Sequence, residues 1–178
     1  MNTLLGYYSM NPIETLAERE VYSSGPITLQ ELTLQQNNTQ LTRVLLRFDS
    51  DAVLIIPRFA NNDFLLIKQH RLSIPDALLE FPSGGVEDGE TPLQAATREL
   101  REETGAQASF IALGFFYPLA GIVDLKVHVF LADITHIDEQ ELEDYEDIQL
   151  IRLTQEELHQ EELVDGYALA ALGLYASR

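Results

Sequence analysis

One segment of this sequence restricts the fold more than any other: GGVEDGETPLQAATRELREETGA, residues 84–106. Its first part is rich in glycine, and the residues that follow are those that start helices. Thr91 suits the N-cap, Pro92 suits the first helical position, and Gln94 completes a capping box with Thr91. Gly105 suits the left-handed conformation in which many helices end. The segment therefore predicts a glycine-rich loop followed by a single helix.

Inside this helix, small and apolar residues recur at spacings of three and four, which predicts one buried face: Leu93, Ala96, Thr97, Leu100 and Thr104. The carboxylates of Glu99, Glu102 and Glu103 lie on the other side and converge. A solvated acidic face, with Arg98 and Arg101 as partners, is one interpretation. A hard divalent cation such as Mg²⁺, which takes oxygen ligands and bridges to substrate phosphates, is the other. The adjacent glycines favour the cation site, because they let a ligand approach the backbone closely.

The overall charge limits the partners of this chain. Asp and Glu number 29 against 11 Lys and Arg, which gives a formal net charge of −18. Such a field opposes nucleic acids and anionic membranes, so neither is expected as a partner. It also repels a phosphorylated substrate, unless a local cation reverses its sign.

Two further features of composition bear on the class of protein. The chain has no cysteine, which excludes disulfides, thiolate metal sites and cysteine nucleophiles. Its first residues lack the basic start and continuous apolar core of a secretory signal, and its apolar runs are too short to span a bilayer. We therefore expect a cytoplasmic protein.

The remaining sequence predicts many strands and few helices. Val, Ile, Leu and Thr are concentrated in segments that we expect to be strands: 19–25, 27–35, 41–49, 52–59, 64–71, 110–117, 126–132 and 148–153. Turn residues separate the early segments: Ser24-Gly25, Asn37-Asn38 and Asn61-Asn62-Asp63. Thr154 starts a capping box with Glu157, and Asp165 suits the N-cap of a last helix. The expected fold class is α+β.

The segment 84–106 resembles the Nudix box, G-x5-E-x7-R-E-U-x-E-E-x-G-U, in which U is an apolar residue. Every defined position is filled: Gly84, Glu90, Arg98, Glu99, Leu100, Glu102, Glu103, Gly105 and Ala106. The two long fixed gaps make this pattern far more specific than a glycine-rich loop alone. The resemblance implies a Nudix α/β/α sandwich with a mixed sheet, and metal-dependent hydrolysis of a nucleoside diphosphate linked to another moiety.

The same resemblance implies a set of metal ligands: the backbone carbonyl of Ser83 and the carboxylates of Glu99, Glu102 and Glu103. They would bind about two or three Mg²⁺ ions, for which Mn²⁺ can substitute. Glu102 and Glu103 also count as catalytic residues. Glu90 orients Arg98, which braces the glutamates; a purely structural ion pair would also explain these two residues.

The flanking segments resemble the ADP-ribose pyrophosphatase branch of the family, which also contains hydrolases of GDP-mannose and other nucleotide sugars. The similar segments are LLIKQHR, LEFPSGGVEDGE, YPLAGIVDLKVHVFLA and YEDIQLIRLTQEEL. The similarity covers about residues 15–175. It implies hydrolysis of the pyrophosphate bond of nucleoside diphosphate sugars, with a nucleoside monophosphate and a sugar phosphate as products.

This branch resemblance also assigns further site residues. Arg71, with Glu80 and Gly84, is assigned to substrate binding, and Glu146 in a late acidic loop is assigned as general base. Other carboxylates of that loop are alternatives for the base: Glu139, Glu141, Glu143 and Asp144. The structural alternatives are a strand-end ion pair between Arg71 and Glu80, and an ordinary surface position for Glu146.

The sequence departs from the pattern of ADP-ribose enzymes at one place. They usually carry a proline about fifteen positions after the box, where this chain has Ala120, and Leu125 stands where an acidic residue is common. ADP-ribose is still the expected substrate. The alternatives are GDP-mannose or a similar nucleotide sugar, a dinucleotide, or a catalytically silent Nudix domain that binds nucleotide sugars and regulates a partner.

The strands before the box predict an additional region. We assign residues 1–48 to an N-terminal β-strand dimerisation region and residues 49–178 to the Nudix hydrolase domain. In the resembling branch, such strands pair with a second subunit and complete the substrate site. The expectation is a homodimer that acts on a small nucleotide-sugar substrate.

Overall fold

The computed structural model describes residues 12–142 and 147–178. Within these ranges the chain forms two compact units: the residues up to Asp49 together with Gly121–Asp124, and Ser50–Ala120 together with Leu125–Arg178. The short segment 121–124, which the sequence analysis placed in the second region, belongs with the N-terminal strands because it pairs with one of them.

The first unit is a four-stranded sheet of β1 (Glu14–Ser24), β2 (Ile27–Gln36), β3 (Thr39–Phe48) and β9 (Val123–Asp124), in that order. The first three strands run antiparallel, and β9 is parallel to β3. Both tight turns contain a residue with positive φ, Gly25 at 54° and Asn37 at 55°. Glycine and asparagine adopt this conformation at low cost, so the turns predicted at these positions are confirmed.

The second unit is built around a mixed seven-stranded sheet. Its strands are β4 (Ala52–Arg58), β5 (Phe64–His70), β6 (Ala77–Glu80), β7 (Ser83–Gly85), β8 (Ala106–Phe116), β10 (Val127–Ile137) and β11 (Gln149–Leu153). The main order is β11-β5-β4-β10-β8, while β6 pairs with β5 and β7 pairs with β4. Only β4 and β10 pair in parallel among the described strands of this sheet, which makes the sheet mixed.

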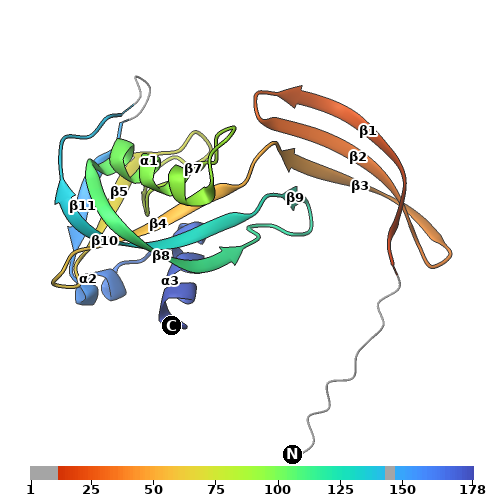
Figure 1. Cartoon of the computed structure of the whole chain (residues 1–178). Helices are drawn as coiled ribbons and strands as arrows, with labels where there is room; N and C mark the ends of the chain where they lie inside the picture. The colour runs from red at the N-terminus through yellow and green to blue at the C-terminus, as the bar shows by residue number, and fades with distance from the viewer. Residues whose placement is uncertain (1–11, 143–146) are drawn as a thin grey trace, which may run out of the picture. The chain divides into compact units, whose positions relative to one another are not determined.

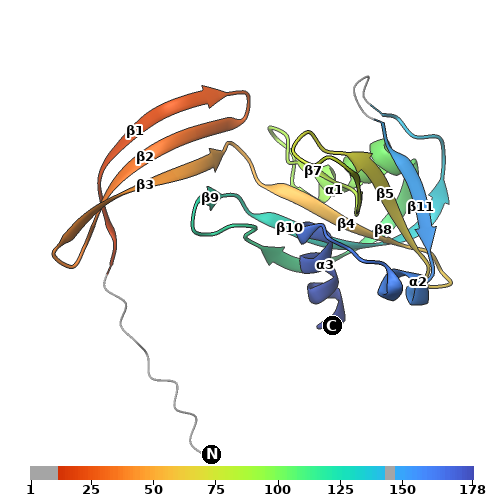
Figure 2. The same ribbon diagram turned by 180° about the vertical axis from the view of Figure 1, so that it is seen from behind.

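Helices cover both faces of this sheet. They are α1 (Pro92–Thr104), α2 (Gln155–Gln160) and α3 (Gly166–Ala176), and α1 and α3 lie on opposite faces (Figures 1 and 2). The capping box of Thr154 and Glu157 and the N-cap at Asp165 form as predicted. No helix in the described part of the chain is long and apolar enough to cross a membrane.

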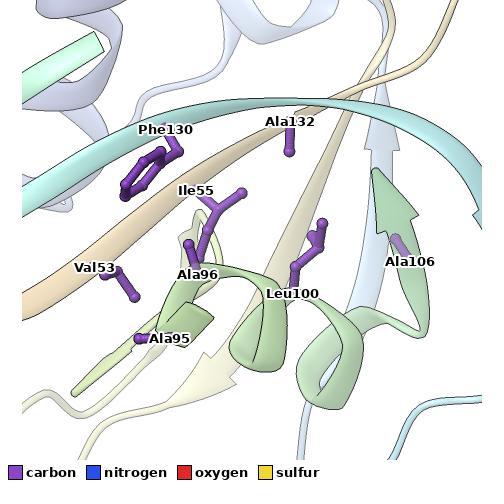
Figure 3. Packing of buried hydrophobic residues seen from close by; sticks show 8 residues of the cluster. All are labelled: Val53, Ile55, Ala95, Ala96, Leu100, Ala106, Phe130 and Ala132. Carbon is purple, nitrogen blue, oxygen red and sulfur yellow. The ribbon is translucent and has the colours of Figure 1, made fainter. Parts of the chain in front are cut away.

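The core of the second unit lies between the sheet and α1. The central strands β4 and β5 contain runs of consecutive buried residues, because both faces of each strand are covered. On the α1 side the strands and the helix meet in one cluster (Figure 3): Val53, Ile55, Ala95, Ala96, Leu100, Ala106, Phe130 and Ala132. This packing fixes the helix against the β4 and β10 strands.

The predicted α+β class is confirmed, but several strand bounds were wrong. The structure starts β1 at Glu14 and β8 at Ala106, and it continues β10 to Ile137, each several residues beyond the expected limit. All residues of β1 are exposed, and the end of β10 is exposed as well. Such ends lack the apolar alternation on which strand prediction depends, while backbone pairing still extends through them.

Candidate active site

The helix that carries the glutamates begins and ends as predicted. Thr91 accepts a hydrogen bond from the backbone N–H of Gln94, and the Gln94 side chain accepts one from the backbone N–H of Thr91 at 2.8 Å. Gly105 ends the helix with φ of 69°. A Cβ at this position would stand 2.2 Å from the carbonyl oxygen of Asp138, so both the backbone conformation and the close packing require glycine.

The buried face of α1 differs from the prediction. Leu93 and Thr97 are exposed, whereas Ala95 and Glu103 are buried. The helix turns Ala95, Ala96 and Leu100 toward β4 and β10, where they join the core cluster. Glu103, which was expected on the side opposite the buried face, is therefore only 4% exposed.

Arg98 is the centre of the polar network on α1. Its Nε donates to Glu90 Oε1 at 3.0 Å, and its Nη1 donates to Glu99 Oε1 at 2.7 Å and to Glu102 Oε2 at 3.1 Å. Its Nη2 donates to the carbonyl oxygen of Gly85 at 2.9 Å. The hydrogen bonds to Glu90 are the main cause that raises the pKa of Arg98 above its ordinary value, and the same bonds lower the pKa of Glu90. The Arg98 guanidinium thus holds the box loop and two of the glutamates together.

Glu99 lies directly against the box glycine. A Cβ on Gly84 would stand 1.9 Å from Glu99 Oε1, so the carboxylate occupies the space that any other residue would fill. Gly84 pairs with Val53 of β4, whose side chain is on the α1 face of the sheet. This contact gives a steric reason for glycine at the first position of the box.

Glu103 faces the strand before the box. Its Oε2 accepts a hydrogen bond from the backbone N–H of Ser83 at 2.9 Å. Nearby, the buried Glu80 forms an ion pair with Arg71, whose Nε donates to Glu80 Oε1 at 3.0 Å. The hydrogen bond to Glu80 is the largest cause that raises the pKa of Arg71, and Glu103 contributes electrostatically. The structure therefore brings Arg71, which follows β5, and the predicted residues of β6, β7 and α1 into one electrostatic neighbourhood.

The glutamates do not form a ready-made metal cluster. Within the described residues, no group of three or more His, Asp or Glu side chains is arranged to hold a metal ion. Glu99 and Glu102 turn toward Arg98, and Glu103 accepts from Ser83. Glu99 and Glu102 thus converge on one nitrogen of Arg98, while Glu103 is oriented by the backbone of Ser83.

The acidic loop follows β10, and its first residues lie beside the end of α1. The backbone N–H of Glu141 donates to the carbonyl oxygen of Glu102 at 2.9 Å, and the Gln140 side chain donates to that of Glu103 at 2.6 Å. Glu141 also lies 3.5 Å from Arg101. Three carboxylates considered as the general base lie outside the described residues: Glu143, Asp144 and Glu146.

Two residues at the start of α3 belong to this neighbourhood but were not selected from the sequence as site residues. Asp165 and the Tyr167 phenol both interact electrostatically with the Arg71 guanidinium. Asp165 was identified only as the N-cap of the last helix, and Tyr167 lies in the first turn of that helix. Their link to the site arises from the packing of α3 against the sheet, for which the sequence gives no local signal.

A glycine loop and an Arg98-centred glutamate helix on a mixed sheet define the Nudix class of proteins. Residues 49–172 match the family model of the NUDIX domain. The chain therefore belongs to the Nudix family, and the sandwich fold and the pyrophosphohydrolase class predicted from the box are confirmed.

Individual relatives support the predicted branch. The ADP-ribose pyrophosphatase of Bacillus subtilis (strain 168) is 29% identical over 147 residues, which cover 81% of this chain and 80% of that protein. The methanol dehydrogenase activator of Bacillus methanolicus is 28% identical with the same coverage. The crystal structure of an ADP compounds hydrolase superimposes with a TM-score of 0.81 over 95% of both chains at 23% identity, which shows a common fold. The resemblance to the ADP-ribose pyrophosphatase branch is thereby confirmed.

Proposed function

We propose that this protein hydrolyses the pyrophosphate bond of nucleoside diphosphate sugars, with ADP-ribose as its principal substrate. The products are a nucleoside monophosphate and a sugar phosphate. The observation that carries this proposal is the complete box in its folded setting, with Glu99 against Gly84 and Glu103 against Ser83. The similarity to an ADP-ribose pyrophosphatase over most of both chains supports the substrate class.

The donor set of the site fits hard divalent cations. Nudix hydrolases generally use divalent metals, and the ligands proposed here are the Ser83 carbonyl with Glu99, Glu102 and Glu103. All are oxygen donors, the kind that Mg²⁺ and Mn²⁺ prefer. The space beside Gly84, which a Cβ would fill, keeps the Glu99 carboxylate at the box loop. We propose about two or three Mg²⁺ ions per site, which when bound offset the phosphate charge and act as Lewis acids.

The protein residues have separate proposed roles around the diphosphate. Arg71 binds a phosphate, and the buried Glu80 fixes its guanidinium by the ion pair. Arg98 and Glu90 position the glutamates. Glu146, in the acidic loop that begins beside α1, is proposed as the base that removes a proton from the attacking water. A base outside the metal ligands is preferable, because bound cations stabilise the charged form of a ligand carboxylate.

The first unit is proposed to act in assembly. In one row of its sheet the apolar residues Tyr22, Leu29, Leu46 and Val123 lie side by side across all four strands. Tyr22 is 64% exposed. A second copy of this chain would cover such a surface, so we propose a homodimer in which residues 1–48 supply the interface.

A substrate panel tests this function. Liberated nucleoside monophosphate would be measured with ADP-ribose, GDP-mannose and dinucleotides, in the presence of Mg²⁺ and again with EDTA. We expect the highest kcat/KM with ADP-ribose, no activity in EDTA, and recovery with Mg²⁺ or Mn²⁺. Preference for GDP-mannose would reassign the substrate. Binding of the nucleotide sugars without hydrolysis of any would identify a regulatory domain instead of an enzyme.

A further inference from the structure

Tyr167 lies in the first turn of α3 and is fixed against the sheet. Its ring makes an edge-to-face contact with Phe116 of β8, with centroids 5.4 Å apart and an interplanar angle of 87°. Tyr167 itself is only partly buried. Such a contact restricts the ring while leaving the phenol end available.

The backbone register relates Phe116 to the box loop. Phe116 pairs with Val127 of β10, Val127 pairs with Ala52 of β4, and Ala52 pairs with Gly85 of β7. These four residues form one row across the sheet, which ends at Gly85, the residue after the first box glycine. Tyr167 therefore contacts the sheet in the row that leads to the box.

The alternation of strand residues then decides which side of β7 faces α3. Gly84 faces α1, since a Cβ there would meet Glu99. Its neighbours Ser83 and Gly85 must face the opposite side of the sheet, the side on which α3 packs against β4, β8 and β10 (Figure 2). Apart from Gly85 and its two chain neighbours, no atom of the described residues lies within 4 Å of the place that a Cβ would take on Gly85. Open space thus exists at the end of the row, on the face where Tyr167 lies.

The Tyr167 phenol also interacts electrostatically with Arg71, the arginine proposed to bind a phosphate. The Arg71 guanidinium interacts with Glu80, Glu103 and Asp165, and the Tyr167 phenol interacts with Arg71 and Asp165. Burial is the main cause that raises the pKa of Tyr167 above its ordinary value, Asp165 raises it further, and Arg71 opposes the shift. The phenol is therefore protonated at neutral pH and can donate a hydrogen bond.

We propose that Tyr167 is a substrate-binding residue whose hydroxyl donates a hydrogen bond to a phosphate oxygen of the nucleoside diphosphate. This inference rests on the proposed function and extends it to a residue outside the Nudix box. The surrounding carboxylates Glu80 and Glu103 accept hydrogen bonds but donate none when ionised, and Arg71 is shared with Glu80. The Tyr167 hydroxyl is a neutral hydrogen-bond donor. Unlike a cationic side chain, it would not form an ion pair with the neighbouring carboxylates.

The test is removal of the hydroxyl alone. Tyr167→Phe keeps the ring and its contact with Phe116, so the fold should be retained, which thermal unfolding would check. Tyr175→Phe is the matched control: it removes a hydroxyl from the same helix, where Tyr175 accepts from Arg58 at 3.2 Å. We expect the KM for ADP-ribose to rise roughly tenfold in Tyr167→Phe with kcat changed less than about twofold. Tyr175→Phe should keep the wild-type KM.

A binding measurement without turnover separates this inference from the proposed function. The dissociation constant of ADP in the presence of Mg²⁺ would be measured by calorimetry, and it should rise by a similar factor in Tyr167→Phe. An unchanged dissociation constant would overturn the contact with phosphate. A loss of kcat at constant KM would also overturn it, because it would indicate a contact made only in the transition state. Absence of hydrolysis in the wild type would refute the proposed function alone.

Discussion

The N-terminal sheet and the Nudix domain differ in how far each buries its own apolar side chains. In the described part of the first unit no residue is buried, and apolar side chains such as Val21, Tyr22 and Val44 are about half exposed or more. In the second unit β4 and β5 are buried, and the helix packs on them with a continuous core. A sheet covered by helices on both faces stabilises the second unit by itself, whereas a sheet without a covered face needs another surface.

The charged residues of the second unit are also held within the unit, by hydrogen bonds and ion pairs. Around α1, the charged side chains of Glu90, Arg98 and Glu103 have defined partners, and Glu103 is almost completely buried. Buried carboxylates are costly unless they are hydrogen-bonded or bind cations. Substitutions in this network should therefore alter activity strongly, while substitutions on the exposed face of the first unit should alter assembly.

The largest effect is expected at the buried glutamate. Glu103→Gln removes one negative charge but keeps an oxygen that can accept from Ser83, so the fold should be retained. We expect kcat to fall by roughly 10²-fold or more, because a proposed metal ligand is lost. Turnover with Mg²⁺ and circular dichroism would be measured together. Glu156→Gln, at an exposed acid of α2, should keep most of its activity; equal losses in both variants would refute the special role of Glu103.

A smaller effect is expected at the first box glycine. In Gly84→Ala the new Cβ would meet the end of the Glu99 side chain at 1.9 Å, and this flexible end can move away. The melting temperature should therefore change little, while displacement of Glu99 lowers kcat by roughly thirtyfold. Gly173→Ala, where no described atom lies within 4 Å of the new Cβ, provides a control. A large loss of stability without a specific loss of kcat would show that Gly84 serves packing only.

The next effect concerns the first unit: a substitution there should change assembly, which substitutions in the second unit should not. Tyr22→Glu places a charge in the exposed apolar row and should weaken the proposed dimer roughly tenfold or more. Light scattering over a dilution series would follow conversion to a particle of one 20.1 kDa chain. Ile111→Glu, at a similarly exposed position of the second unit, is the matched control. A wild-type protein that is monomeric at micromolar concentration would contradict the assembly proposal.

Local signals explain why much of the box could be predicted from the sequence. The caps of α1 involve residues within three or four positions of each other, so Thr91, Gln94 and Gly105 identified both ends of the helix. The contact between Glu90 and Arg98 also follows from the fixed spacing of the resembling family, and it is present. The proximity of Arg71 to Glu80 could be foreseen as a strand-end pair, although its role toward substrate stays a prediction.

The features that were missed depend on contacts between distant segments. The face of α1 that is buried is set by β4 and β10, so the helical spacing alone selected Leu93 and Thr97 wrongly. Tyr167 reaches the site only because α3 packs on Phe116. The short β9 joined the N-terminal sheet through pairing with β3 across a long separation in sequence. None of these contacts leaves a periodic pattern that sequence analysis could detect.

The smallest expected effect is the stability that the Glu90 charge contributes through Arg98. The hydrogen bonds from Arg98 lower the pKa of Glu90, and the backbone N–H of Glu87 lowers it further, while partial burial opposes the shift. A carboxyl group with a lowered pKa in the folded state stabilises the fold above its unfolded pKa, near 4.5, and loses that contribution as the pH falls through the folded value.

Glu90→Gln removes the charge while keeping the shape of the side chain. We expect its free energy of unfolding to be lower than that of the wild type by about 1 kcal/mol at about pH 7, since the pair is partly exposed. Urea unfolding in EDTA at a series of pH values would measure this difference, which should shrink as the pH falls below about 4. A difference that stays constant over that range would mean that Glu90 acts through packing instead of charge. In that case Arg98 would be held electrostatically mainly by Glu99, Glu102 and the Gly85 carbonyl.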